Sequence, residues 1–290
     1  MQEVNMREKR ETALVTGASS GIGRETTSRL VEKGFQVIAA ARRMDRLTEL
    51  ADQSGGITPK QVDLSDPGDT ERFCQEISSL PEPVSVLINN AGYSIRGALE
   101  DVSMEALKRI FEVNLFSLIR VTQACLPGMR GQRKGTVVNL STIVGKFTFP
   151  MSGVYSGTKH ALEAVTDSLR MEVRPFGIRV ITIRPGVIAT EFNEVATQMT
   201  GDLMARTDPD YKPVYQAAGA GVGGMFAGVT IPGPELIADL ILEAVLSDTP
   251  KTVYAAGPFV EDILGKRFEL DDDGFDRFWT EKTGLTDLKV

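Results

Sequence analysis

The stretch VTGASSGIG, residues 15–23, decides the fold of this 290-residue chain. It follows a short apolar run, ALVT at 13–16, and opens an amphipathic stretch, IGRETTSRLVEKG at 22–34, which ends at Gly34 as a helix does. Small residues between a strand and a helix let the backbone approach a pyrophosphate, which the free N–H groups at the helix start favour. Because glycine-rich turns also occur for packing reasons, this stretch alone leaves both interpretations open.

Further apolar runs follow, separated by helical patterns. The predicted strands are ALVT at 13–16, QVIAAA at 36–41, KQVD at 60–63, VSVLIN at 84–89, GTVVNLS at 135–141, IRVITIRP at 178–185 and TVYAAG at 252–257. They are nearly continuously apolar, which is typical of parallel strands covered on both faces. Strand–helix alternation with right-handed crossovers therefore predicts an α/β fold: a doubly wound, mostly parallel, seven-stranded sheet with helices on both faces.

We expect one domain over residues 1–290, because the chain shows no repeat and no linker. Residues 12–190 form its predicted cofactor-binding and catalytic core. Residues 191–233 interrupt the alternation, and such insertions are often lids over a substrate. Residues 234–290 hold a predicted helix, PELIADLILEAVL, the last strand and a tail. In the tail, the acidic cluster 271–273 is expected to be a solvated turn before a docked helix.

Composition excludes several classes of function. A net charge of −7 and a pI near 5.0 disfavour binding to nucleic acid. The two cysteines match no metal or redox motif, so we predict structural thiols in a reducing compartment and no metal site. Residues 1–10 lack the apolar core of a signal peptide, and no apolar run reaches the roughly 18 residues of a membrane helix. A cytoplasmic protein is expected.

Four further features point to chemistry: NNAG at 89–92, Asn114, Ser141 and the pair Tyr155 and Lys159. With the glycines, they resemble the short-chain dehydrogenase/reductase family in its single-domain Rossmann-type form, from about Thr12 to Gly186 and again in the final helix and strand. The resemblance implies an oxidoreductase that transfers a hydride between NADP(H) and a carbonyl/alcohol pair. It also implies a homodimer or homotetramer paired through the helices that hold Asn114 and Tyr155.

The resemblance assigns Asn114, Ser141, Tyr155 and Lys159 as the catalytic set. Tyr155 and Lys159 are four residues apart, so they share one helix face, and an adjacent ammonium is expected to lower the phenol's pKa from its usual ~10. Ser141 would hydrogen-bond the substrate oxygen. Asn114 would support a water relay to Lys159, although a satisfied core amide is the alternative. His160, the only histidine, is rotated about 100° from Lys159 and is expected to be structural, facing a neighbouring helix or a subunit interface.

Two other classes of protein remain as alternatives. Residues 17–21 match G-x-S-x-G, the nucleophile elbow of serine hydrolases, which would use Ser19 and His160. Against it, this elbow follows the first strand, so no earlier strand and loop supplies an oxyanion hole, and no HGGG-like segment exists. A nonenzymatic NADPH-sensing protein would keep the fold without using the catalytic set.

The second strand indicates which nicotinamide cofactor is bound. Ala41 stands where NAD-dependent relatives place an acid for the ribose 2′-hydroxyl, and Arg42 and Arg43 follow it. Guanidinium groups match phosphate geometry, so NADP is predicted with Arg42 as the main contact; two solvated arginines are the alternative. The predicted cofactor-binding residues are Gly17, Ser19, Gly21, Ile22, Gly23, Arg42, Arg43, Asp63, Leu64, Asn90, Gly92, Tyr155, Lys159, Val187 and Thr190.

The predicted substrate pocket is apolar. Its residues are Ser141, Ile143, Val144, Tyr93, Ile95, Phe149 and Met151, and the glycine-rich segment 213–234 adds Met225 and Phe226. Apart from Lys146, these stretches show no evident Arg or Lys, so a carboxylate or phosphate would lack a clamp. A bulky hydrophobic ketone, aldehyde or secondary alcohol is therefore predicted. The alternative is that these residues pack in the core and the substrate is small and polar.

Overall fold

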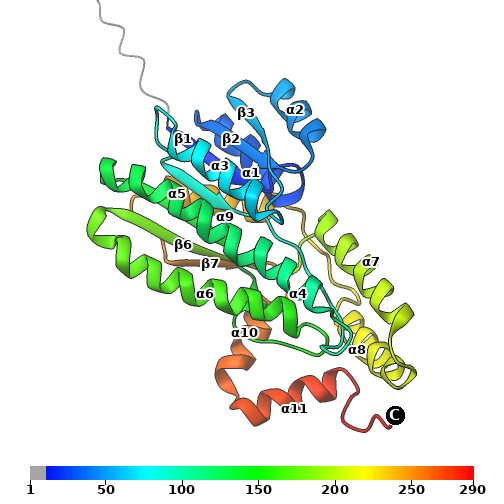
Figure 1. The fold of residues 1–290 in the computed structure, drawn as a ribbon. Helices are drawn as coiled ribbons and strands as arrows, with labels where there is room; N and C mark the ends of the chain where they lie inside the picture. Colours follow the sequence, from blue (N-terminus) through cyan, green and yellow to red (C-terminus); the bar gives the residue numbers. More distant parts are fainter. Residues whose placement is uncertain (1–10) are drawn as a thin grey trace, which may run out of the picture.

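A computed structural model describes residues 11–290, and its centre is one sheet of seven parallel strands in the order β3-β2-β1-β4-β5-β6-β7 (Figure 1). The strands are β1 (Thr12–Thr16), β2 (Gln36–Ala41), β3 (Ile57–Gln61), β4 (Val86–Asn89), β5 (Gly135–Leu140), β6 (Ile178–Pro185) and β7 (Val253–Ala256). The predicted doubly wound sheet is confirmed. The strand order changes direction between the neighbouring strands β1 and β4, and open α/β sheets bind ligands at such a point.

Helices cover both faces of the sheet. They are α1 (Gly21–Glu32), α2 (Met44–Gln53), α3 (Pro67–Ser78), α4 (Met104–Phe111), α5 (Ser117–Gln132), α6 (Gly153–Val173), α7 (Glu191–Arg206), α8 (Lys212–Gly224), α9 (Glu235–Leu246), α10 (Val260–Glu269) and α11 (Asp272–Lys282). Leu30 of α1 and Ile237 of α9 pack in the core on one face, whereas Phe73 of α3 and Val121 of α5 pack in the core on the other.

The continuous apolar runs follow from this two-sided cover. In β1, Ala13 and Val15 lie in one core and Leu14 lies in the other, and all three are completely buried. Successive strand residues point to opposite faces, so a strand covered on both sides has no position for a solvated side chain.

The third strand begins three residues earlier and ends two residues earlier than predicted. The apolar run suggested 60–63, but β3 spans Ile57–Gln61 and pairs with β2 from Val37 opposite Ile57. It contains Pro59, which has no N–H to donate. Because β3 is an edge strand, the missing donor leaves no ladder partner unsatisfied.

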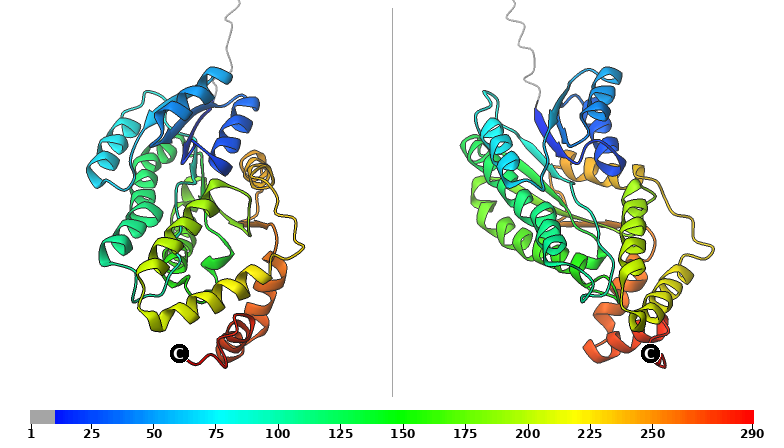
Figure 2. Two further views of the ribbon diagram at one scale, coloured as in Figure 1. Left: turned by 90° about the vertical axis from the view of Figure 1, so that its right-hand side faces the viewer. Right: turned by 45° about the vertical axis from the view of Figure 1, so that its right-hand side comes forward.

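Apart from α9 and β7, the elements that follow β6 gather at one end of the molecule. Figure 2 shows α7, α8, α10 and α11 together beyond the end of the sheet, and a Cβ on Gly221 of α8 would lie 2.5 Å from Thr283 just after α11. Asp271 caps α11 by accepting a hydrogen bond from the Gly274 N–H (2.7 Å). Trp279 of α11 is buried and stacks on Phe147, with ring centroids 5.8 Å apart. The predicted docked helix after the acidic turn is confirmed.

Cys74 and Cys125 are free and buried, as expected of structural thiols. Burial raises the pKa of Cys74 to about 11 and that of Cys125 to about 12. Across residues 11–290, no helix has the length and hydropathy needed to cross a bilayer. The expectation about a signal peptide concerns residues 1–10, which lie outside the described residues.

Candidate active site

A cleft of about 730 Å³ runs along the carboxyl ends of the strands. Its floor comes from the segment after each of six strands: residues 17–22, 41–43, 62–65, 90–96, 140–144 and 185–188. Residues from α7, the end of α8, α10 and α11 close its outer side. The volume is in the range of small-molecule and cofactor sites, and the position is the one that the strand order predicts.

The glycine loop forms one end of the cleft. Gly17 has a φ of +68°, and a Cβ there would lie 2.8 Å from Asn90 Nδ2. Asn90 Nδ2 in turn donates to the carbonyls of Thr16 (2.9 Å) and Gly17 (3.2 Å), which fixes the loop against β4. Gly21 lines the cleft with Gly17, but Gly23 does not. A Cβ on Gly23 would overlap Asn90 Nδ2 and Gly17 O, so this glycine serves packing.

The start of α1 suits an anion. Ser20 precedes the helix without a side-chain cap, and the first turn contains no acidic residue. Its N–H groups are therefore available to a phosphate, as in dinucleotide-binding turns. This cradle and the long cleft fit a nicotinamide dinucleotide. Among residues 11–290, no group of three His, Cys, Asp or Glu side chains could hold a metal ion.

The two arginines after β2 differ in their contacts. Arg43 donates to the hydroxyls of Ser19 (3.2 Å) and Ser20 (2.7 Å) and forms an ion pair with Glu191 (2.8 Å), the first residue of α7. It thereby ties the glycine loop to α7. Arg42 also lines the cleft and is exposed, and within residues 11–290 its side chain makes no hydrogen bond or ion pair.

Tyr155 and Lys159 both lie on α6, are buried and line the cleft. Lys159 Nζ donates to the Leu140 carbonyl at the end of β5 (2.7 Å). Burial lowers the pKa of Lys159 to about 8, against the opposing charge of Glu163. Burial raises the pKa of Tyr155, and the charge that opposes this rise belongs to Arg96. Lys159 is not among the groups that act on this pKa in the chain by itself, so the expected lowering by Lys159 is not seen there, and the phenol is protonated at neutral pH.

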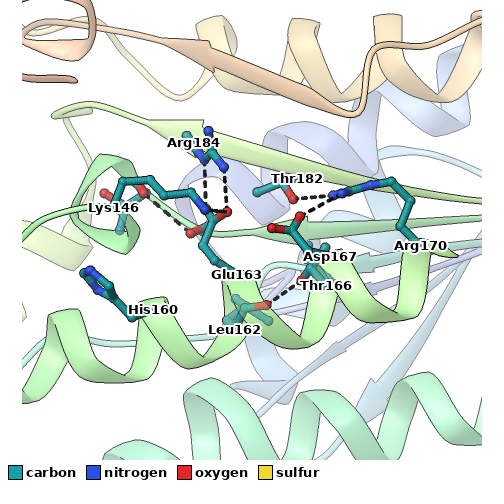
Figure 3. A network of polar contacts seen from close by, with 12 residues as sticks. Lys146, His160, Leu162, Glu163, Thr166, Asp167, Arg170, Thr182 and Arg184 are labelled. Carbon is teal, nitrogen blue, oxygen red and sulfur yellow. Dashed lines mark hydrogen bonds and ion pairs between the residues drawn. The ribbon is translucent and has the colours of Figure 1, made fainter. Parts of the chain in front are cut away.

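Ser141 follows β5 directly and is held by a hydrogen bond from its N–H to Ile183 O (2.8 Å). Its hydroxyl is hydrogen-bonded to the carboxylate of Glu163. That carboxylate, only 2% exposed, accepts two hydrogen bonds from Arg184 (2.9 and 2.7 Å) and pairs with Lys146 (3.3 Å) (Figure 3). Although burial acts to raise it, hydrogen bonds from Arg184 and Ser141 hold the pKa of Glu163 below its usual value.

Asn114 lies in a π-helical turn, Glu112–Phe116, that interrupts the predicted helix between α4 and α5. Its side chain is fully buried and fully bonded: Nδ2 donates to Tyr93 O (2.9 Å) and Thr158 Oγ1 (3.1 Å), and Oδ1 accepts from Tyr93 N–H (3.0 Å). It does not line the cleft. The structure thus shows a satisfied amide that fixes the segment after β4 to α6, and the water relay stays a prediction.

Most of the predicted pocket residues line the cleft: Ser141, Ile143, Val144, Tyr93, Ile95, Phe149, Met225 and Phe226. Met151 is a correction. It has a φ of +67° and lines a second pocket instead, and its carbonyl accepts from the Gly97 N–H (2.8 Å). The left-handed backbone turns the chain there, before α6 begins at Gly153, which the residue types alone did not indicate.

The charge of the pocket also needs correction. Lys146 lines the second pocket and not the main cleft, and its charge is paired with Glu163. It therefore supplies no positive charge to the predicted substrate pocket. Arg96, in contrast, lines the main cleft. The sequence contains a signal for Arg96, because this residue immediately follows Ile95, a predicted pocket residue. Three aromatic wall residues, Phe192, Phe259 and Trp279, were missed since only the fold brings them to the cleft.

His160 is exposed on α6, and its Nδ1 lies 2.9 Å from the carbonyl of Ser156, one turn earlier on the same helix. In Figure 3 no dashed line joins it to the Glu163 network. It lines the second pocket together with Phe275 and Thr280 of α11, and its expected structural role stays a prediction, as does a subunit interface. Ser19 lines the main cleft whereas His160 lines the second pocket, so the pair required by the hydrolase alternative is not assembled.

Comparison with known proteins agrees with this geometry. The model of the short chain dehydrogenase family matches residues 11–201. The uncharacterized oxidoreductase YbbO of Escherichia coli (strain K12) is 34% identical over 245 residues, which are 84% of each chain. A short-chain dehydrogenase structure from Streptomyces avermitilis is 28% identical with a TM-score of 0.74, covering 97% of this chain and 100% of the other. A serine dehydrogenase complexed with NADP+ is 25% identical with a TM-score of 0.72, covering 85% and 94%.

Proposed function

The chain belongs to the short-chain dehydrogenase/reductase family of nicotinamide-dependent oxidoreductases, and we propose that it transfers a hydride between NADP(H) and the carbonyl/alcohol pair of a bulky hydrophobic substrate. One observation carries the proposal. Tyr155, Lys159 and Ser141 line the same cleft as the glycine loop, so a dinucleotide bound along it reaches the proton-transferring groups.

The proposed reaction assigns a separate task to each side chain. The bound nicotinamide supplies or accepts the hydride. Ser141, positioned at the end of β5, donates its hydroxyl hydrogen to the substrate oxygen instead of to Glu163. The phenol of Tyr155, which its raised pKa keeps protonated at neutral pH, gives its proton to the oxygen that becomes the alcohol. Lys159, whose pKa is about 8, donates a hydrogen bond to the Leu140 carbonyl. In this proposal its ammonium supplies the proton that converts the phenolate of Tyr155 back to the phenol.

NADP is the proposed form of the cofactor. Ala41 leaves no carboxylate to repel a 2′-phosphate, and the free guanidinium of Arg42 beside it has the geometry that phosphate binds. The serine dehydrogenase that binds NADP+ supports the same choice. In this proposal Arg43, which follows β2, supports the phosphate site through its hydrogen bonds to Ser19 and Ser20 of the glycine loop. Asp63 and Leu64, which line the cleft, would contact the adenine, and Val187 and Thr190, which also line it, would contact the carboxamide.

Residues 191–233 are proposed as the lid. Phe192 and Met199 of α7 and Met225 after α8 face the cleft, and they make its outer wall apolar. Such a wall favours a bulky hydrophobic ketone, aldehyde or secondary alcohol. A single domain, a homodimer or homotetramer and a cytoplasmic location stay predictions from the sequence.

The test is Tyr155→Phe, with NADPH consumption measured over a panel of apolar ketones and aldehydes. Removing the proton donor should lower turnover by about two to four orders of magnitude, while NADPH binding, followed by nicotinamide fluorescence, is retained. Tyr211→Phe, on the exposed turn before α8, is the matched control and should keep full activity. Undiminished turnover by Tyr155→Phe would refute the mechanism. Stoichiometric NADPH binding without turnover of any carbonyl would favour the sensing protein.

A further inference from the structure

Arg96 is fixed in place by both ends of its loop. Upstream, Asn114 accepts from and donates to the backbone of Tyr93. Downstream, the Ala98 N–H donates to the hydroxyl of Tyr215 in α8 (2.9 Å), and a Cβ on Gly97 would lie 2.6 Å from Leu203 of α7. The backbone that carries Arg96 is therefore held between the sheet and the lid, and the side chain lines the main cleft.

The charge of Arg96 has no counter-ion in the described part of the chain. Among residues 11–290, its guanidinium forms no hydrogen bond and no ion pair. The three carboxylates that line the cleft are engaged or remote: Glu191 pairs with arginines at the cofactor end, Asp63 accepts from Ser65, and Glu105 is exposed. Burial lowers the pKa of Arg96, and the group that opposes this is the phenol of Tyr155, not a carboxylate.

An arginine nevertheless stays charged in a protein, and a charge partly withdrawn from water, like that of the half-buried Arg96, is stabilised by a partner. The cleft that Arg96 lines also has aromatic walls, formed by Phe149, Phe192, Phe259 and Trp279. An incoming anionic oxygen group would supply the missing partner, and a guanidinium holds a carboxylate through two parallel hydrogen bonds.

We propose that Arg96 binds a carboxylate of the substrate, which makes the substrate an apolar oxo acid or hydroxy acid rather than a neutral ketone. This rests on the proposed function, in which the neighbouring Tyr155 protonates the reacting oxygen. Because Arg96 and Tyr155 line the same cleft, one substrate can present its carboxylate to Arg96 and its reacting oxygen to Tyr155. The apolar remainder lies against the aromatic wall, where the rings of Phe192 and Tyr155 are 5.9 Å apart.

The protein carries its own probe for this subsite. Trp279 is the only tryptophan in the chain and lines the cleft. Titrations of its fluorescence with phenylbutyrate and with the neutral phenylbutyramide compare two ligands of the same shape that differ in charge. We expect the wild-type protein to bind the acid roughly 10- to 100-fold more tightly, the range of hydrogen bonds to a charged group. Arg96→Gln should abolish this difference and leave amide binding within about twofold. Arg96→Lys should keep part of the affinity difference, because lysine retains the positive charge but cannot form the two parallel hydrogen bonds of a guanidinium.

Arg109→Gln is the matched control. Arg109 lines the same cleft at its cofactor end, where its guanidinium donates to the hydroxyl of Ser65 (3.4 Å). Its removal should therefore leave the ratio of acid affinity to amide affinity unchanged. Equal affinity of the wild-type protein for the two ligands, no binding of either, or an unchanged ratio in Arg96→Gln would overturn the proposal. Failure of the proposed function can be told apart from failure of this inference. Full turnover by Tyr155→Phe would refute the proposed mechanism, but it would not change the ratio of acid affinity to amide affinity.

Discussion

Replacing Glu163 with glutamine is expected to lower the free energy of unfolding by about 3 kcal/mol. The carboxylate is 2% exposed and accepts two hydrogen bonds from Arg184, whose side chain is 14% exposed. Removing one partner of a buried ion pair costs about 3–5 kcal/mol, because the other charge is left without compensation. Water reaches Lys146, which is 28% exposed, and glutamine still accepts one hydrogen bond. The lower end of the range therefore applies.

The pH dependence of the loss has a definite sign. The pKa of Glu163 is held below its usual value in the folded protein, so the carboxylate stabilises the fold above the unfolded pKa of about 4.3. This contribution is lost as the pH falls through the folded pKa. The difference between wild type and Glu163→Gln should thus be complete at about pH 7 and shrink below about pH 4.

Urea unfolding of the ligand-free protein, followed by circular dichroism, measures this difference. Glu172→Gln is the control: it lies on the same helix but is exposed, so its effect should stay within about 0.5 kcal/mol. A loss below about 1 kcal/mol for Glu163→Gln at neutral pH, or one that persists unchanged in acid, would refute the assignment of a stabilising buried ion pair.

Three further predictions follow from single positions. Arg42→Asp should shift the ratio of kcat/KM for NADP over NAD toward NAD by at least about tenfold, since it replaces the phosphate partner with a repelling charge, and an unchanged ratio would show that the phosphate lies elsewhere. Gly23→Ala should destabilise the protein by about 1–3 kcal/mol in urea because its Cβ overlaps Gly17 O, whereas Gly131→Ala, with open space on α5, should stabilise it by up to about 1 kcal/mol; equal effects would contradict the packing argument. His160→Ala should keep the rate of carbonyl reduction within about twofold of the wild-type rate, because the imidazole is exposed and is bonded only to its own helix. Loss of carbonyl reduction would contradict a purely structural role for His160.

The sequence by itself determined the relations within each element and the order of the elements. Continuous apolar runs such as QVIAAA predict a strand covered on both faces, and β2 spans the same residues, Gln36–Ala41. The four-residue spacing of Tyr155 and Lys159 predicts one helix face, and both side chains line the cleft from α6. These predictions hold because backbone periodicity is local: side-chain directions along a strand or helix follow from the covalent chain alone.

The tertiary structure alone decided the environment of each charge. The direction of the Tyr155 pKa, the partner of Lys159 at Leu140 and the unpaired state of Arg96 all depend on segments far apart in the chain. The same is true of Trp279, which reaches the cleft only because α11 docks there. Burial and electrostatic partners are properties of the space between packed elements, and desolvation of a phenol or a guanidinium is set by what surrounds it rather than by its neighbours in sequence.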